Sequence, residues 1–128
     1  MKSKLLTLIV VLLILDVIWI NNVMSERYSQ IFNNLLIGNI ELNYIYAFIT
    51  YCIMVLALYY FVLRESKDAN NALFRGALMG FIMYGVYDGT LYSFLPIKDY
   101  QTGLLDVAWG TFVCGFSSYI AFRYGKNL

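Results

Sequence analysis

Four apolar segments constrain the fold of this chain more than any other feature. They cover residues 5–22, 43–63, 73–95 and 103–122. Each has about the 20 residues that a helix needs to cross a hydrocarbon core of about 30 Å. A segment inside lipid must satisfy its own backbone hydrogen bonds, and a helix does so without a neighbour. The sequence therefore predicts an all-α, polytopic integral membrane protein with four transmembrane helices in an antiparallel bundle.

The composition requires the lipid bilayer as a partner. Hydrophobic residues make up 61% of the chain and charged residues only 13%. A soluble domain of this size buries only roughly 60–70% of its chain's surface, so it could not hide this much apolar area. The four segments use most of the chain, so residues 1–128 are predicted to form a single transmembrane domain. The net charge is +1, which does not favour a nucleic-acid partner.

The distribution of lysine and arginine predicts the orientation. The termini and the second connection hold seven of the nine: Lys2, Lys4, Arg64, Lys67, Arg75, Arg123 and Lys126. Arg27 and Lys98 are in the other two connections. By the positive-inside rule, this is a multi-pass membrane protein with both termini cytoplasmic. The polar connection 65–71 is short, so the second and third segments should be antiparallel neighbours.

An amphipathic helix is predicted on the outer side, between the first two membrane segments, over residues 25–37. Its apolar positions follow helical spacing: Tyr28, Ile31, Phe32, Leu35 and Leu36. Ser25 is a suitable N-cap and Gly38 a suitable stop. This segment is expected to lie on the membrane surface or over the mouth of the bundle.

Three aspartates, Asp16, Asp88 and Asp106, fall inside the apolar segments. A carboxylate in hydrocarbon costs on the order of 2.5–3.5 kcal/mol on insertion scales, so each needs a partner or a purpose. A rise of 1.5 Å per residue places all three roughly 16–24 Å from the cytoplasmic end of their segments. All three are therefore predicted in the outer half of the bilayer.

Two of these aspartates belong to similar pentads, 15–19 (LDVIW) and 105–109 (LDVAW). In each pentad the tryptophan follows the aspartate by three residues and so shares its helix face. Because the first and fourth segments run in opposite directions, Trp19 and Trp109 should lie at the same height. This arrangement suits a pseudo-two-fold axis in the membrane plane, as in inverted repeats.

A buried carboxylate requires hydrogen bonds, a counter-charge or a proton. Tyrosine and tryptophan can donate hydrogen bonds to it. The candidate ligand- or ion-binding residues are therefore Asp16, Asp88, Asp106, Trp19, Trp109, Tyr84 and Tyr87. Arg27, on the predicted outer side, is the candidate counter-charge. No cofactor is indicated, and the residues leave the presence of a metal open.

Two Gly-x-x-x-Gly patterns lie in the third segment, Gly76/Gly80 and Gly85/Gly89. Such patterns let a second membrane helix approach closely. Either pair could form the face of a homo-oligomer.

Three groups of residues carry a resemblance to a known family. They are Leu-Asp-x-x-Trp in the first segment, Arg75-Gly76-Ala77-Leu78-x-Gly80 with Tyr84-Gly85-x-Tyr87-Asp88 in the third, and Asp106-x-Ala108-Trp109-Gly110-Thr111 in the fourth. The chain resembles domain-of-unknown-function family 2177, small four-span membrane proteins. It departs from the family pattern after Asp88, reading Gly89-Thr90-Leu91 instead of Leu-Thr-Asn. The resemblance implies a shared fold and site, and no particular reaction.

Three functions are compatible with these residues. The first is a cation or proton channel or transporter that uses the intramembrane acids. The second is a structural or assembly protein whose aspartates join helices by hydrogen bonds. The third is a lipid-related accessory protein or enzyme. The chain has no histidine and no Ser-His-Asp arrangement, which argues against an enzyme.

Overall fold

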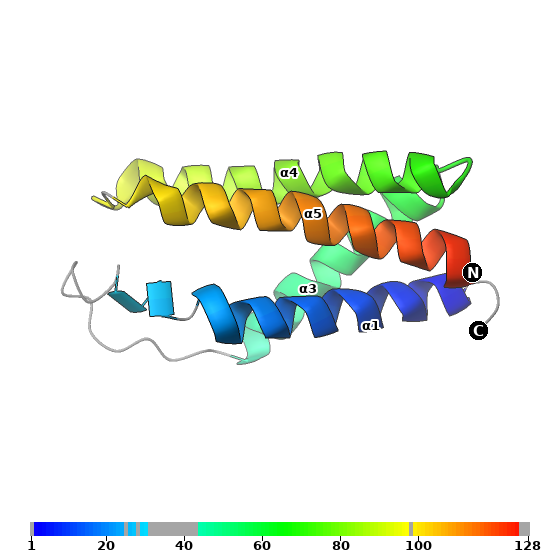
Figure 1. Ribbon diagram of the computed structural model, residues 1–128, viewed down its shortest axis with the longest axis horizontal. Coiled ribbons are helices and arrows are strands. Elements are labelled where there is room, and N and C mark those ends of the chain that lie inside the picture. The colour runs from blue at the N-terminus through cyan, green and yellow to red at the C-terminus, as the bar shows by residue number, and fades with distance from the viewer. Residues whose placement is uncertain (1, 25, 28, 31–43, 98, 126–128) are drawn as a thin grey trace.

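The computed structural model describes residues 2–24, 26–27, 29–30, 44–97 and 99–125 (Figure 1). The described residues form long helices and contain no strand, which confirms the predicted all-α membrane fold. The helical elements are α1 (Lys2–Trp19), the π-helical turn η1 (Ile20–Met24), α3 (Tyr44–Leu58), the π-helical turn η2 (Tyr59–Leu63), α4 (Ala69–Phe94) and α5 (Tyr100–Tyr124). Most of the predicted amphipathic helix 25–37 lies outside the described residues.

Local sequence signals set the bounds of the last two helices. Asp68 and Asp99 are the N-caps of α4 and α5, and each side chain accepts a hydrogen bond from a backbone N–H three residues later, at 2.7 and 3.3 Å. α4 ends at Phe94 because Pro96 disfavours the helical conformation in Leu95, which is extended with φ −102° and ψ 139°. These signals fix the ends of the connection 64–68, which precedes α4, and of the connection 95–99, which joins α4 to α5.

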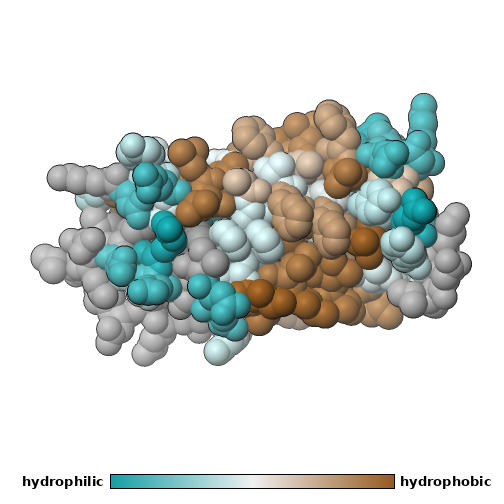
Figure 2. Space-filling view, viewed as in Figure 1, coloured by the Kyte–Doolittle hydropathy of each residue, from teal (hydrophilic) through white to brown (hydrophobic). Residues whose placement is uncertain are grey.

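The helices are suited to a bilayer. Three helical stretches are long and apolar enough to cross one, namely Ser3–Asn22, Tyr44–Leu63 and Tyr100–Tyr124. α4 is less apolar, because it contains Arg75 and Asp88. It nevertheless lies alongside α5 over its length, so a bilayer around α5 also encloses α4 (Figure 1). Figure 2 shows a hydrophobic band across this face, with hydrophilic residues toward both ends.

The first and last described residues, Lys2 and Gly125, lie at the same end of the bundle, as predicted (Figure 1). We call this the termini end; it also holds the connection 64–68. The opposite end, with the connection 95–99, is the loop end. That the termini end faces the cytoplasm stays a prediction from the positive-inside rule.

Small residues allow α4 and α5 to pack closely. A Cβ added at Gly80 would lie 2.8 Å from the Cβ of Cys114 and still closer to the carbonyl oxygen of Gly110. A Cβ at Gly76 would lie 2.6 Å from the hydroxyl of Ser118. Gly76 and Gly80 therefore pack against α5 of the same chain, and a homo-oligomer through this pair stays a prediction.

The Gly85/Gly89 pair differs, since a Cβ added at either position would meet none of the described residues within 4 Å. None of the described helices covers this face of α4. Its use in a homo-oligomer stays a prediction.

The other two helices attach to the α4–α5 pair in different ways. α1 packs along α5, and buries Leu8 and Leu12 in the core. α3 crosses the bundle obliquely (Figure 1) and contacts α4 mainly through η2, near the termini end. The second and third segments are thus neighbours only there. Toward the loop end α3 exposes Tyr44 and Phe48, and none of the helices that the structure describes covers them.

The glycine packing gives a matched test of stability. We expect Gly80→Ala to lower the free energy of unfolding by about 1–3 kcal/mol, because the added methyl group forces α4 and α5 apart. Gly85→Ala, on the open side of the same helix, should cause no loss. Thermal unfolding in detergent, followed by circular dichroism, measures both. Equal melting temperatures for the two variants would contradict this packing.

Candidate functional site

Asp16 is the centre of the site. Its carboxylate is only 3% exposed, although α1 has a large lipid-facing surface. The Tyr51 hydroxyl of α3 donates to Oδ2 at 2.5 Å. The Trp109 indole N–H of α5 donates to Oδ1 at 2.8 Å. One carboxylate therefore joins three helices, and both of these partners are neutral.

The two tryptophans stack directly on each other. The rings of Trp19 and Trp109 have centroids 4.5 Å apart and planes that differ by 2°. The prediction that both indoles lie at one height is confirmed.

The pseudo-two-fold arrangement is not complete at the level of hydrogen bonds. Trp109 of the second pentad donates to Asp16 of the first pentad. The symmetric counterpart would be a bond from Trp19 to Asp106. Instead, the Trp19 indole nitrogen is buried and makes no hydrogen bond in the described part of the chain. The two pentads thus play different roles.

Asp88 and Asp106 form a second level of carboxylates. α4 and α5 are antiparallel and packed in a fixed register, in which Tyr84 lies opposite Gly110 and Gly80 lies opposite Cys114. A move of four residues toward the C-terminus of α4 therefore corresponds to a move of four residues toward the N-terminus of α5. In this register Asp88 of α4 lies at the height of Asp106 of α5. Asp88 is 4% exposed and Asp106 is half-buried. Asp106 lies one helical turn nearer the loop end than Trp109, so this level is closer to that end than Asp16.

Two predicted tyrosines accompany these acids. Tyr84 packs on Gly110, at a height between Asp16 and the level of Asp88 and Asp106. Tyr87 precedes Asp88 on α4 and is 63% exposed. Of the two, Tyr84 is the more buried.

Arg27 lies at the start of α5. Its guanidinium donates to the Thr102 hydroxyl at 3.3 Å, and that hydroxyl donates to Asp99 at 2.7 Å. The hydrogen bonds from Thr102 hold the pKa of Asp99 below its ordinary value, and the Arg27 charge acts in the same direction. The positive charge therefore acts on Asp99 at the loop end. That Arg27 neutralises the intramembrane acids stays a prediction.

The acids do not assemble a metal site. Within the described residues, no group of three or more His, Cys, Asp or Glu side chains could hold a metal ion. The two levels separate the carboxylates along the bundle axis, which explains this result.

Tyr51 was not among the residues predicted for the site. It lies in the charge-free second segment among several tyrosines, and nothing in its spacing distinguishes it from them. Only the oblique path of α3 brings its hydroxyl to Asp16. The presence of a hydroxyl deep in an apolar segment was the one available signal.

Residues 2–123 match the family described as "Predicted membrane protein (DUF2177)". The chain belongs to this family. The match confirms the resemblance seen in the motifs and covers all four long helices. No curated protein and no solved structure matches the chain. The DUF2177 description gives a membrane location and no reaction, so the function has to be argued from the site.

The stacked tryptophans allow a matched test of the Asp16 site. Trp109→Phe removes the N–H that binds Asp16, whereas Trp19→Phe removes an N–H without a hydrogen-bond partner. Both variants keep an aromatic ring in the stack. We expect Trp109→Phe to lower the free energy of unfolding by about 1–3 kcal/mol more than Trp19→Phe. Denaturant titration in detergent measures the difference, and equal losses would speak against this hydrogen bond.

Proposed function

We propose that this DUF2177 protein conducts or transports protons, with Asp16 as the proton-binding group. The observation that carries the proposal is the Asp16 carboxylate itself, 3% exposed and bound by two neutral donors. Burying an ionised carboxylate without a counter-charge is costly, and taking up a proton relieves that cost. Intramembrane carboxylates of this kind form the proton relays of pumps and transporters.

A proton suits this site better than a metal cation. Calcium and magnesium require six or more oxygen ligands. The described residues offer no cluster of acids for such a cation. Both Asp16 oxygens already accept hydrogen bonds from rigid aromatic side chains.

Toward the loop end, Tyr84 packs on Gly110 at a height between Asp16 and Asp106. Asp106 is half-buried. A tyrosine hydroxyl can both donate and accept a hydrogen bond. This order of groups supports a proton route from the loop end to Asp16 through Asp106 and Tyr84.

Toward the termini end, α5 supplies further polar groups. Cys114 is fully buried in the core. Ser117 and Ser118 follow about 4.5–6 Å farther along the helix and are fully buried. Their hydroxyls make no hydrogen bond in the described part of the chain. Such hydroxyls favour a route that continues from Asp16 toward the termini end.

Proton flux into proteoliposomes under a pH gradient tests the proposal. Wild type should acidify the vesicles faster than empty liposomes, because Asp16 binds and releases protons. Asp16→Asn keeps the size and an acceptor oxygen but cannot titrate, so its flux should fall to that of empty liposomes.

The control is Glu65→Gln, which removes an exposed carboxylate in the 64–68 connection and should leave the flux unchanged. Flux from Asp16→Asn at the wild-type rate would exclude Asp16 as the proton-binding group. Absence of flux from wild type under any gradient would exclude conduction.

A structural role is the second candidate, and the joining of α1, α3 and α5 by one carboxylate favours it. Asp16→Leu leaves the Tyr51 and Trp109 donors without their acceptor, so it should cost about 1–3 kcal/mol per donor. Asp16→Asn keeps an acceptor and should cost less. Melting temperatures of both variants in detergent measure this order. A protein without proton flux and with the melting order Leu below Asn below wild type would fulfil the structural role alone.

A further inference from the structure

The repeated pentads leave one hydrogen-bond donor without a partner. Trp109 of the second pentad donates to Asp16 of the first pentad at 2.8 Å. The Trp19 indole nitrogen is buried and makes no hydrogen bond in the described part of the chain. A buried donor that lacks an acceptor loses the free energy of its hydrogen bonds to water, so an orphaned N–H in a folded protein requires an explanation.

The second pentad contains an acceptor of the kind that this donor lacks. Asp106 precedes Trp109 by three residues, as Asp16 precedes Trp19. α1 and α5 run in opposite directions (Figure 1), so the two aspartates lie on opposite sides of the stacked rings. Each aspartate is about 4.5 Å along its helix from the tryptophan of its own pentad. The pair of Trp19 and Asp106 therefore repeats the spacing of the observed pair in the opposite direction.

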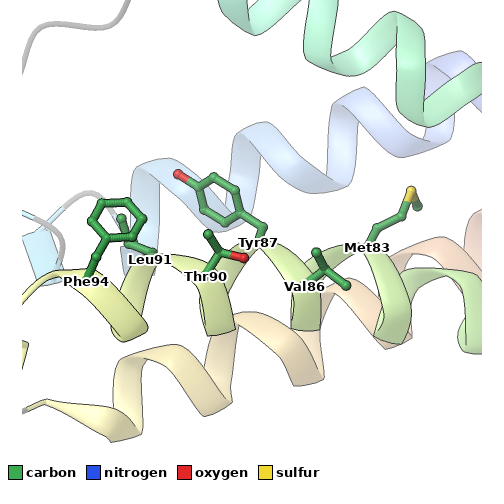
Figure 3. A pocket seen from close by; sticks show the side chains of 6 residues that line it. All are labelled: Met83, Val86, Tyr87, Thr90, Leu91 and Phe94. Carbon is green, nitrogen blue, oxygen red and sulfur yellow. The ribbon is translucent and has the colours of Figure 1, made fainter.

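The α4–α5 pair has no cation near the level of Asp106. α4 has no lysine or arginine over residues 76–94, and the side chains labelled on this stretch in Figure 3 are apolar or carry a neutral hydroxyl, as in Tyr87 and Thr90. α5 has no lysine or arginine over residues 100–122. Neutral donors are therefore the partners that these two helices can offer to an ionised Asp106, and an indole N–H is such a donor.

We propose that Trp19 and Asp106 form a second state of this site, and that one hydrogen bond exchanges between the two pentads. In the state that the structure shows, Trp109 donates to Asp16. In the second state the stacked rings move toward the loop end, so that Trp19 donates to Asp106. The same movement takes the Trp109 N–H away from Asp16. The rings move together because their centroids are 4.5 Å apart and their planes differ by only 2°.

The exchange has the symmetry of an inverted repeat. In transporters that are built from inverted repeats, the two repeats rearrange against each other and open the site first to one side and then to the other. Here the two carboxylates accept an indole N–H in turn. The inference concerns hydrogen bonds and does not require proton conduction. Absence of flux would leave the exchange standing, and absence of exchange would leave Asp16 as the proposed proton-binding group.

Nuclear magnetic resonance of the indole N–H groups tests the exchange in the full chain, prepared with isotope-labelled tryptophan in detergent micelles. The chain contains two tryptophans, so the spectrum should hold two indole signals. Trp19→Phe removes one signal and thereby assigns both. Hydrogen bonding moves an indole proton to lower field, so the Trp19 signal reports whether the second state forms.

Two variants remove the hydrogen bond of the first state. Asp16→Leu removes the acceptor, and Trp109→Phe removes the donor while it keeps an aromatic ring in the stack. In either variant the Trp19 signal should move to lower field, because the second state then has no competitor. Addition of Asp106→Leu to each variant should return this signal to higher field. Glu65→Leu replaces an exposed carboxylate at the termini end and is the control that should leave both signals in place.

Two results would overturn the proposal. One is a Trp19 signal at the same field in Trp109→Phe and in the matched variant that also carries Asp106→Leu. This comparison cancels the effect of the smaller phenyl ring on the signal. The other is a shift to lower field that persists after Asp106→Leu, since the acceptor would then be another group. Trp109→Phe keeps the hydrogen bond from Tyr51 to Asp16, so the test stands even where Asp16→Leu fails to fold.

Discussion

The structure depends on hydrogen bonds to the carboxylate of Asp16, which is buried among helices in lipid. Asp16 cannot keep a hydration shell there, so donors must come from the protein. Tyr51 and Trp109 provide them from two other helices. α1 and α3 have few other contacts with each other. The hydrogen bond from Tyr51 is therefore the main specific link between the oblique helix and α1.

The close packing of α4 on α5 provides the platform for this site. Helices in lipid gain little from hydrophobic burial, so close backbone approach at small residues supplies much of their attraction. Gly80 and Gly110 permit that approach, and Tyr84 then packs on Gly110 between the two levels of acids. The same rigid pair sets the height of Asp88 against Asp106.

Helix geometry made several features of the site predictable. Length and hydropathy predict the long helices, and the rise per residue predicts the heights of the aspartates and tryptophans. The stacking of Trp19 on Trp109 follows from two antiparallel helices with equal spacing from aspartate to tryptophan. Rise and rotation are properties of each helix alone, so no knowledge of the neighbours is needed. The roles of these residues in proton binding remain predictions.

The sequence by itself determined the membrane class, the helices, the shared end of the two termini and the common height of the two tryptophans, because these follow from local geometry and from the solvent. Only the tertiary structure decided which side chains meet. It packed Gly76 and Gly80 against α5, brought Tyr51 to Asp16, and left Trp19 without the hydrogen bond that the repeated pentad suggests. The physical reason is that lateral contacts depend on the rotation and crossing angle of each helix. In lipid, the rotation and crossing angle are set by close packing at small residues and by hydrogen bonds between the few polar side chains. The sequence alone does not show which helices pack together or at which angle they cross.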